Sequence, residues 1–103
     1  MPDPRLLLLD EPATGLDVLA RDALGSSLTR LAAQYPALAT VTTTHHLDDL
    51  PPVTTHAAVL AGGRLVAAGP VADVLTSATL SAAYGAELRA WHDTAGWHLQ
   101  LER

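Results

Sequence analysis

The sequence of 103 residues contains no cysteine and no lysine, and only 17% of its residues are charged. The lack of cysteine excludes disulfide bonds and thiolate metal sites. No apolar run approaches the roughly 18 residues that a membrane-spanning helix requires, and 49% hydrophobic residues are too many for a disordered chain. The start, Met-Pro-Asp-Pro, lacks the charged and apolar regions of a signal peptide. These absences predict a globular chain in the cytoplasm.

Basic side chains are also scarce. Six basic residues, all of them arginine, stand against eleven acidic ones, which gives a formal net charge of −5. Proteins that bind nucleic acid gain much of their affinity from basic side chains on the phosphate backbone. We therefore predict no nucleic-acid partner. A chain of this length buries about 60–65% of its unfolded surface, so it forms one small domain or part of a larger one.

The first half of the chain predicts two strands joined by a helix. Residues 5–10 contain a continuous leucine run, which is typical of a strand covered on both faces. Apolar side chains recur at spacings of three and four over residues 18–35, which indicates an amphipathic helix with Asp17 as its N-cap. Residues 37–43 are rich in β-branched side chains and predict a second strand. In such a unit the two strands run parallel.

The second half predicts shorter elements. Two apolar runs flank Gly62-Gly63, the sequence form of a tight hairpin turn. A short helix is expected over residues 70–77, because proline is favoured in a first turn, and a second over residues 79–84, closed by Gly85. The alternating pattern near the C-terminus predicts a hairpin that turns at residues 94–96.

Acidic and histidine side chains follow the two predicted parallel strands at the point where each ends. Asp10 and Glu11 come directly after the first strand, and His45 and His46 follow the second. In open α/β sheets the ligand lies beyond the carboxyl ends of the strands. A carboxylate can hold Mg²⁺ or polarise a water molecule, and an imidazole can donate to a phosphate oxygen. The pattern favours a site for a metal-bound phosphate and an attacking water.

Three segments around these residues resemble motifs of one family. LLLLDEP resembles the Walker B strand of ATP-binding cassette (ABC) ATPases, ATGLD resembles their D-loop, and TTTHH resembles their H-loop, in the family's order and at about its spacing. The tail HAAVLAGGRLVAAGPVADVL resembles the family's pattern of strand, Gly-Arg turn, strand and short helix. The likeness covers roughly residues 1–85, and we interpret residues 86–103 as a terminal hairpin extension.

The resemblance implies a role for each matching residue. Asp10 would coordinate Mg²⁺, and Glu11 would orient or deprotonate the water that attacks ATP. His45, the histidine directly after the threonine run, would contact the γ-phosphate and is preferred to His46 for this role. Glu11 and His45 are thus the expected catalytic residues, with His45 also binding the nucleotide. Asp17 would reach a second ATPase subunit across a head-to-tail dimer.

Other family motifs are absent from the sequence. It contains no GxxxxGK[ST] phosphate loop, no glutamine loop and no Ser-Gly-Gly signature segment, all of which precede Walker B in ABC ATPases. The resemblance therefore implies that residues 1–103 are the C-terminal segment of an ABC ATPase domain that energises transport across a membrane. The implied partners are the missing N-terminal half, the second ATPase subunit and membrane subunits, with the protein peripheral on the cytoplasmic face. The chain is not expected to hydrolyse ATP alone.

The expected fold class follows from the same resemblance. It is α/β, a partial P-loop NTPase-type layered sheet with parallel strands 5–10 and 37–43 and crossover helix 18–35. Short strands, short helices and a C-terminal hairpin come next. In this class the phosphate-loop strand lies between the H-loop strand and the following one, here residues 57–61. We expect either an open slot beside strand 37–43 or direct pairing of 37–43 with 57–61.

Several alternatives remain at this stage. Asp10 and Glu11 are also typical of a solvated strand end, and Asp17 of a helix cap with no further role. A zinc site is a second alternative, since imidazole suits zinc. Its ligands would be His45, His46 and His56. His45 can also begin a helix, while the residues after it read as a solvated turn: His46, Asp48 and Asp49. The alternative functions are a non-catalytic interaction module or decayed remnant, and a fragment of an ABC-type DNA-repair ATPase.

Overall fold

The computed structural model describes residues 6–102 and divides the chain into two compact units, one ending at Val53 and one beginning at Thr54. The first position of the strand predicted over residues 5–10 therefore lies outside the described residues. Both units mix helices with short strands. No helix in the described part of the chain combines the length and apolar character needed to cross a membrane.

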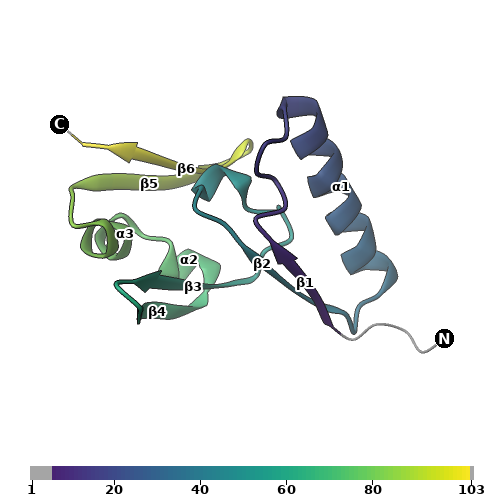
Figure 1. The fold of residues 1–103 in the computed structure, drawn as a ribbon, viewed down its shortest axis with the longest axis horizontal. Helices are drawn as coiled ribbons and strands as arrows, with labels where there is room; N and C mark the ends of the chain where they lie inside the picture. Colours follow the sequence, from purple (N-terminus) through teal and green to yellow (C-terminus); the bar gives the residue numbers. More distant parts are fainter. Residues whose placement is uncertain (1–5, 103) are drawn as a thin grey trace. The chain divides into compact units, whose positions relative to one another are not determined.

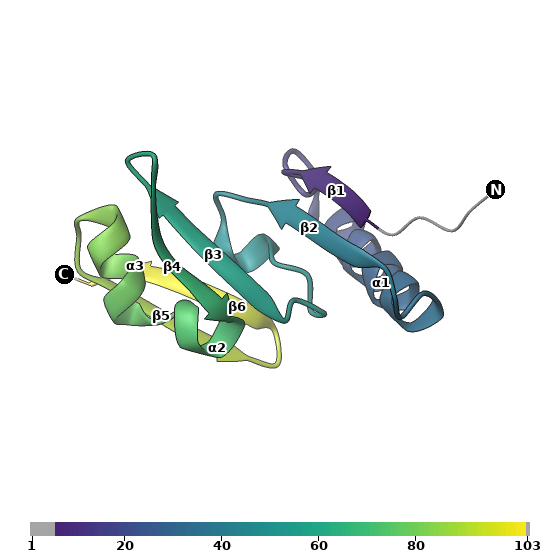
Figure 2. The same cartoon turned by 90° about the horizontal axis from the view of Figure 1, so that it is seen from below.

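The first unit is a βαβ arrangement. Its two strands pair in parallel along their whole length, in register from Leu6 opposite Ala39 to Asp10 opposite Thr43. The connecting helix runs alongside the strand pair (Figures 1 and 2). These observations confirm the predicted order and direction of the strands. The elements are β1 (Leu6–Asp10), α1 (Val18–Gln34), β2 (Ala39–Thr43) and the short 3-10 helix η1 (Leu47–Asp49).

The boundary between α1 and β2 differs from the prediction. The helix predicted over residues 18–35 ends one residue early, and the strand predicted over 37–43 begins two residues late. The amide of Leu38 donates to the carbonyl oxygen of Tyr35 at 2.9 Å, so the segment around Pro36 forms a turn. Proline cannot continue a helix or donate to a ladder, which explains why neither element extends through this segment.

Among the described strands, β2 pairs only with β1. Of the two arrangements expected from the sequence, the structure has the one in which the second edge of β2 remains open. Residues 57–61 instead belong to β3, which pairs with β4. The described strands form three separate two-stranded sheets rather than one continuous sheet.

The second unit contains two antiparallel hairpins and two short helices. The elements are β3 (His56–Ala61), β4 (Arg64–Pro70), α2 (Val71–Val74), α3 (Ser77–Tyr84), β5 (Leu88–Asp93) and β6 (Gly96–Leu101). The β3–β4 turn has positive φ at both Gly62 (57°) and Gly63 (73°), the backbone that a two-residue hairpin turn of this kind requires. Both helices pack against the β3–β4 hairpin. The predicted hairpins are confirmed, except that Gly96 already belongs to β6.

The helix predicted over residues 70–77 is wrong in its length. α2 ends at Val74, and α3 begins after Thr76, whose side-chain oxygen accepts a hydrogen bond from the amide of Thr79 at 3.1 Å. A threonine that caps a new helix has an extended backbone, which interrupts the preceding one. At its other end α3 closes on Gly85 in the left-handed conformation (φ 69°), as predicted.

The core of the second unit is small. Val74, Leu75 and Leu80 are 3%, 6% and 4% exposed, and these are the buried side chains of this unit within the described residues. The first unit buries Ala13 and Leu28 to a similar degree. Because so few side chains carry the apolar burial, each contributes a large share of the stability of its unit.

Two serines of α3 bind the outer edge of β5. The hydroxyl of Ser77 accepts from the amide of Ala90 at 2.9 Å and donates to its carbonyl oxygen at 3.3 Å. The hydroxyl of Ser81 does the same at Leu88, with distances of 2.9 and 3.1 Å. The two serines lie one turn apart on α3, and this spacing matches the two residues that separate Leu88 from Ala90 on β5. Side chains thus take the place of a neighbouring strand along this edge.

The β5–β6 hairpin carries stacked aromatic and imidazole rings on both faces. Trp91 stacks on His98 with ring centroids 5.1 Å apart, and His92 lies against Trp97 at 4.9 Å. The guanidinium of Arg89 lies 4.9 Å from the centre of the Trp91 ring. In the register of the hairpin each of the two histidines lies opposite a tryptophan, so both ring pairs are cross-strand pairs.

We predict a pH-dependent step in this hairpin. The hydrogen bond from the imidazole of His98, and next the one from the amide of Ala95, lower the pKa of Asp93 from its ordinary value of 3.8. Because the pKa is lower in the folded state, the contribution of Asp93 is complete above the ordinary value and is lost as the pH falls through the lowered one. Tryptophan fluorescence should show a step below pH 3.8. Asp93→Asn should remove that step, whereas Asp73→Asn, an exposed control in the same unit, should keep it; equal curves for both would contradict the prediction.

Candidate functional site

The carboxyl ends of β1 and β2 are tied together through Thr43. Its hydroxyl donates to Oδ1 of Asp10 at 2.5 Å and accepts from the amide of Glu11 at 3.1 Å. The same amide lies 3.0 Å from the carbonyl oxygen of Thr43. One side chain therefore contacts both predicted acidic residues and fixes the direction of the Asp10 carboxylate relative to the Glu11 backbone.

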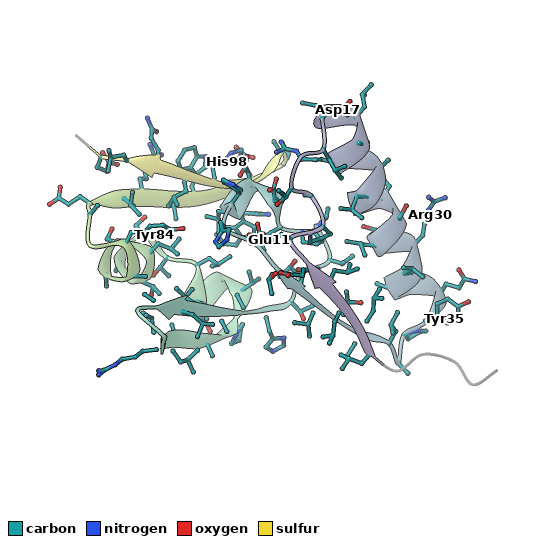
Figure 3. All side chains as sticks on the ribbon, in the orientation of Figure 1. Glu11, Asp17, Arg30, Tyr35, Tyr84 and His98 are labelled. Atoms are coloured by element: carbon teal, nitrogen blue, oxygen red, sulfur yellow. The ribbon has the colours of Figure 1, made fainter. Side chains whose placement is uncertain are left out.

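Glu11 has an unusual backbone. Its φ of 46° lies in the left-handed region, and it is the one non-glycine residue with positive φ within residues 6–102. A side chain with a Cβ is disfavoured there by about 1 kcal/mol or more, and such residues cluster at functional sites. The residue sits directly at the end of β1 (Figure 3), where the amide of Thr14 donates to its carbonyl oxygen at 3.1 Å. The turn that follows β1 thus holds Glu11 in a strained conformation.

The structure brings His45 to Glu11. Nε2 of His45 lies 2.5 Å from Oε1 of Glu11, a charge-assisted contact between the ends of the two strands. The His45 side chain is 82% exposed and that of Glu11 35% exposed, so both groups remain accessible to a ligand. The prediction that His45 begins a helix is wrong, since η1 starts at Leu47 with His46 as its N-cap.

Asp17 occupies the predicted capping position. Its Oδ1 accepts a hydrogen bond from the amide of Ala20 at 2.8 Å, and its carbonyl oxygen accepts from the amide of Arg21 at 2.9 Å. These bonds confirm the N-cap expectation and account for the start of α1. Asp17 takes no part in the contacts among Asp10, Thr43, Glu11 and His45.

Two further contacts were not predicted from the sequence. Thr43 was assigned only to a strand, and Asp49 to a solvated turn. In the structure the Asp49 side chain is 6% exposed and its Oδ1 lies 2.9 Å from Nη1 of Arg21. The solvated-turn interpretation is therefore wrong for Asp49, because α1 covers it.

The donor set at the strand ends suits a hard cation. Asp10 and Glu11 offer carboxylate oxygens, and the Thr43 hydroxyl orients one of them, which is the oxygen-only chemistry that Mg²⁺ prefers. Within residues 6–102 no three histidine, cysteine or carboxylate side chains come together as ligands. The alternative zinc site would combine His45 and His46 of the first unit with His56 of the second.

The arrangement is equipped for acid–base chemistry on a ligand at the sheet edge. A carboxylate within hydrogen-bonding distance of an imidazole can accept a proton from a bound water while the imidazole donates to an oxygen of the ligand. Both groups come from the ends of neighbouring parallel strands, where open α/β sheets bind their ligands.

Known proteins similar to this chain were identified from sequence. It is 40% identical over 82 residues to the uncharacterized ABC transporter ATP-binding protein YlmA of Bacillus subtilis, covering 80% of this chain and 31% of that protein. It is 39% identical over 79 residues to the nickel import ATP-binding protein NikO of Rhodobacter capsulatus, covering 76% and 31%. It is 41% identical over 88 residues to the vitamin B12 import ATP-binding protein BtuD of Escherichia coli, covering 85% and 34%. No protein-family model matches the chain.

A solved structure agrees with these relatives. An inward-facing conformation of a metal-chelate type ABC transporter superposes with a TM-score of 0.73 and 25% identity, covering 95% of this chain and 39% of that one. The α/β arrangement is thus a partial P-loop NTPase-type fold. The chain spans about a third of the length of these relatives and matches their C-terminal part. Over about 80% of its length, this chain belongs to the family of ABC transporter ATP-binding proteins, as the counterpart of their C-terminal part.

Proposed function

We propose that this chain supplies the metal, water and histidine side of the ATP site of an ABC ATPase that energises transport across a membrane. The observation that carries the proposal is the contact between Glu11 and His45 at the ends of two parallel strands. In this assignment Asp10 holds Mg²⁺, Glu11 and His45 are the catalytic residues, and His45 contacts the nucleotide. Asp17 faces a second ATPase subunit in a head-to-tail dimer.

The residues then act as follows during ATP hydrolysis. Glu11 orients a water molecule and accepts its proton as the water oxygen bonds to the γ-phosphorus. The bond from that phosphorus to the bridging oxygen breaks, and the electron pair leaves with ADP. With ATP bound, the Nε2–H of His45 donates to a γ-phosphate oxygen in place of Oε1 of Glu11, its partner in this structure. Mg²⁺, when bound at Asp10, neutralises the negative charge of the phosphates.

The β- and γ-phosphates require a second set of groups, usually a glycine-rich loop with a lysine. The 103 residues contain neither. We therefore place that loop on a separate segment, either another chain or another part of the same polypeptide. Residues 1–85 are the part that corresponds to the ABC ATPase domain, and residues 86–103 are an extension of it. The other proposed partners are membrane subunits on the cytoplasmic face, where this chain is peripheral.

The relatives support transport as the coupled process. Two of them are named for import of nickel and of vitamin B12, and each is an ATP-binding protein of a transporter. The acidic balance of this chain, −5, disfavours the alternative of a DNA-repair ATPase. The proposal therefore assigns this chain to a transport ATPase and leaves specificity for the cargo to the membrane subunits.

A chimera tests the proposal. We would replace the C-terminal part of BtuD, the part that this chain matches at 41% identity, with residues 1–103 and measure release of inorganic phosphate from ATP. The chimera is expected to hydrolyse Mg-ATP, whereas residues 1–103 alone should show neither turnover nor micromolar ATP binding by calorimetry. A well-folded chimera that binds ATP without hydrolysing it would favour the non-catalytic interaction module.

A further inference from the structure

Within the described residues of the first unit, Arg21 and Asp49 form an ion pair whose carboxylate is shielded from water while its guanidinium stays partly exposed. Nη1 of Arg21 lies 2.9 Å from Oδ1 of Asp49, and the side chains are 39% and 6% exposed. A carboxylate so removed from water requires a partner charge or hydrogen bonds to remain ionised. The pair joins α1 to η1, 28 residues apart in the sequence.

The two segments joined by this pair also carry the candidate catalytic residues. Residues 11–21 begin at Glu11 and end at Arg21, and residues 43–49 contain His45 and end at Asp49. The segments are cross-linked at one end by the contact of Glu11 with His45 and at the other by the ion pair. The two segments are therefore joined by a contact near each of their ends.

Hydrogen bonds connect Asp49 to the turn that holds His45. The carbonyl oxygen of His46 accepts from the amide of Asp49 at 3.0 Å and from the hydroxyl of Thr44 at 3.1 Å. The amide of His46 in turn donates to the Thr44 hydroxyl at 3.0 Å. His45 lies between Thr44 and His46 in the sequence. The hydrogen bonds between Thr44 and His46 close the turn around it, and the amide of Asp49 holds the same turn from the other side.

A second contact brings α1 to the same segment. Gly25 lies one helical turn after Arg21 on the same face of α1, and a Cβ placed on it would lie 3.5 Å from Cδ of Pro52. Two successive turns of the helix thus approach η1 and the segment after it, Arg21 at Asp49 and Gly25 at Pro52. This contact is independent of charge and indicates that the segment is fitted against α1 rather than held by a loose surface pair.

We propose that Arg21 and Asp49 are positioning residues that hold His45 against Glu11. The statement that the pair fixes the place of His45 is independent of the proposed function. The statement that this placement matters for ATP hydrolysis rests on the proposed function. Arg21 follows the N-cap Asp17 by one turn, so the start of α1 sets the place of the guanidinium. The guanidinium holds the Asp49 side chain by the ion pair, and the Asp49 amide holds the turn that contains His45 by its hydrogen bond to the carbonyl oxygen of His46.

The test uses NMR of the full 103-residue chain. Asp49→Asn should shift the His45 ring and Glu11 amide resonances and speed amide exchange at position 49 by about tenfold. Arg21→Gln should do the same, and Arg21→Lys, which retains a charge for the single contact, should restore the native resonances. The matched control is Asp48→Asn, an exposed neighbour in η1. A pair that merely stabilises the fold would change the denaturation midpoint and leave the His45 and Glu11 resonances of the folded state in place.

The results separate this inference from the proposed function. If Arg21→Gln or Asp49→Asn folds and leaves the His45 and Glu11 resonances as in the native chain, the positioning role is wrong. In an active chimera, Asp49→Asn should lower kcat by about tenfold with little change in KM for ATP, because geometry and not ground-state binding is lost. If the chimera without further substitutions is inactive, but Asp49→Asn shifts the His45 and Glu11 resonances in the chain, the proposed function is wrong and the positioning role of the pair is retained.

Discussion

Replacing Glu11 by glutamine in the chimera is expected to lower kcat for ATP hydrolysis by about 100- to 10,000-fold, the range that a general base contributes. Glutamine has nearly the same volume and adopts the same backbone, so the turn after β1 is preserved. It cannot accept the proton of the attacking water, and it loses the charge that draws His45 to Oε1. ATP binding should persist, because the phosphates are held elsewhere. The measurements are phosphate release at saturating ATP and nucleotide affinity by calorimetry.

The control for this substitution is Glu87→Gln. Glu87 is exposed and belongs to the second unit, and its substitution removes the same charge as Glu11→Gln. Its turnover should match the unmodified chimera. An unchanged kcat in Glu11→Gln would show that Glu11 is not the general base. A loss of both kcat and ATP binding would mean that the substitution had damaged the fold instead.

Replacing Leu80 by alanine is expected to destabilise the second unit by about 2–5 kcal/mol, the cost of removing a buried leucine side chain and leaving a cavity. Leu80 is 4% exposed and is one of three such side chains in that unit's described core. Small domains have a total unfolding free energy of about 5–15 kcal/mol, so this one change removes a large part of it. Both tryptophans, Trp91 and Trp97, lie in the second unit, so their fluorescence in urea reports its unfolding specifically.

Leu60→Ala provides the matched control, since it deletes the same atoms from a side chain that is 71% exposed on β3. Its effect should stay within about 0.5 kcal/mol, as for surface positions in general. Equal shifts for the two variants would show that the burial of Leu80 does not decide the stability of the unit.

The sequence predicted best those features that depend on neighbouring residues. The strand at the leucine run, the helix α1, the Asp17 cap and the paired glycines between β3 and β4 each depend on a few neighbouring positions, and the structure confirms them. The expectation that the first strand is covered on both faces is wrong, since Leu6 and Leu8 are 55% and 68% exposed. The proximity of Glu11 and His45 was predictable too, since parallel strands bring their carboxyl ends to the same edge.

The features that the sequence did not predict depend on residues far apart. Asp49 resembles any acidic turn residue until α1 is placed over it, and only then does Arg21 become its partner. In the sequence Thr43 is one of several β-branched strand residues, yet its hydroxyl donates to the Asp10 carboxylate and accepts from the Glu11 amide. The strained φ of Glu11 is an exception, since it belongs to the turn directly after β1; it was not predicted because glutamate has no preference for that backbone.

The serine pair of α3 also limits strand addition at the β5–β6 hairpin. Since the hydroxyls of Ser77 and Ser81 already bond the amides and carbonyls of Ala90 and Leu88 on the outer edge of β5, an incoming strand meets unoccupied ladder groups along β6 instead. Fibre growth through strand addition needs two usable edges on every hairpin. Two copies that met through β6 would each present a closed edge to the outside. Assembly by this route therefore stops at a pair.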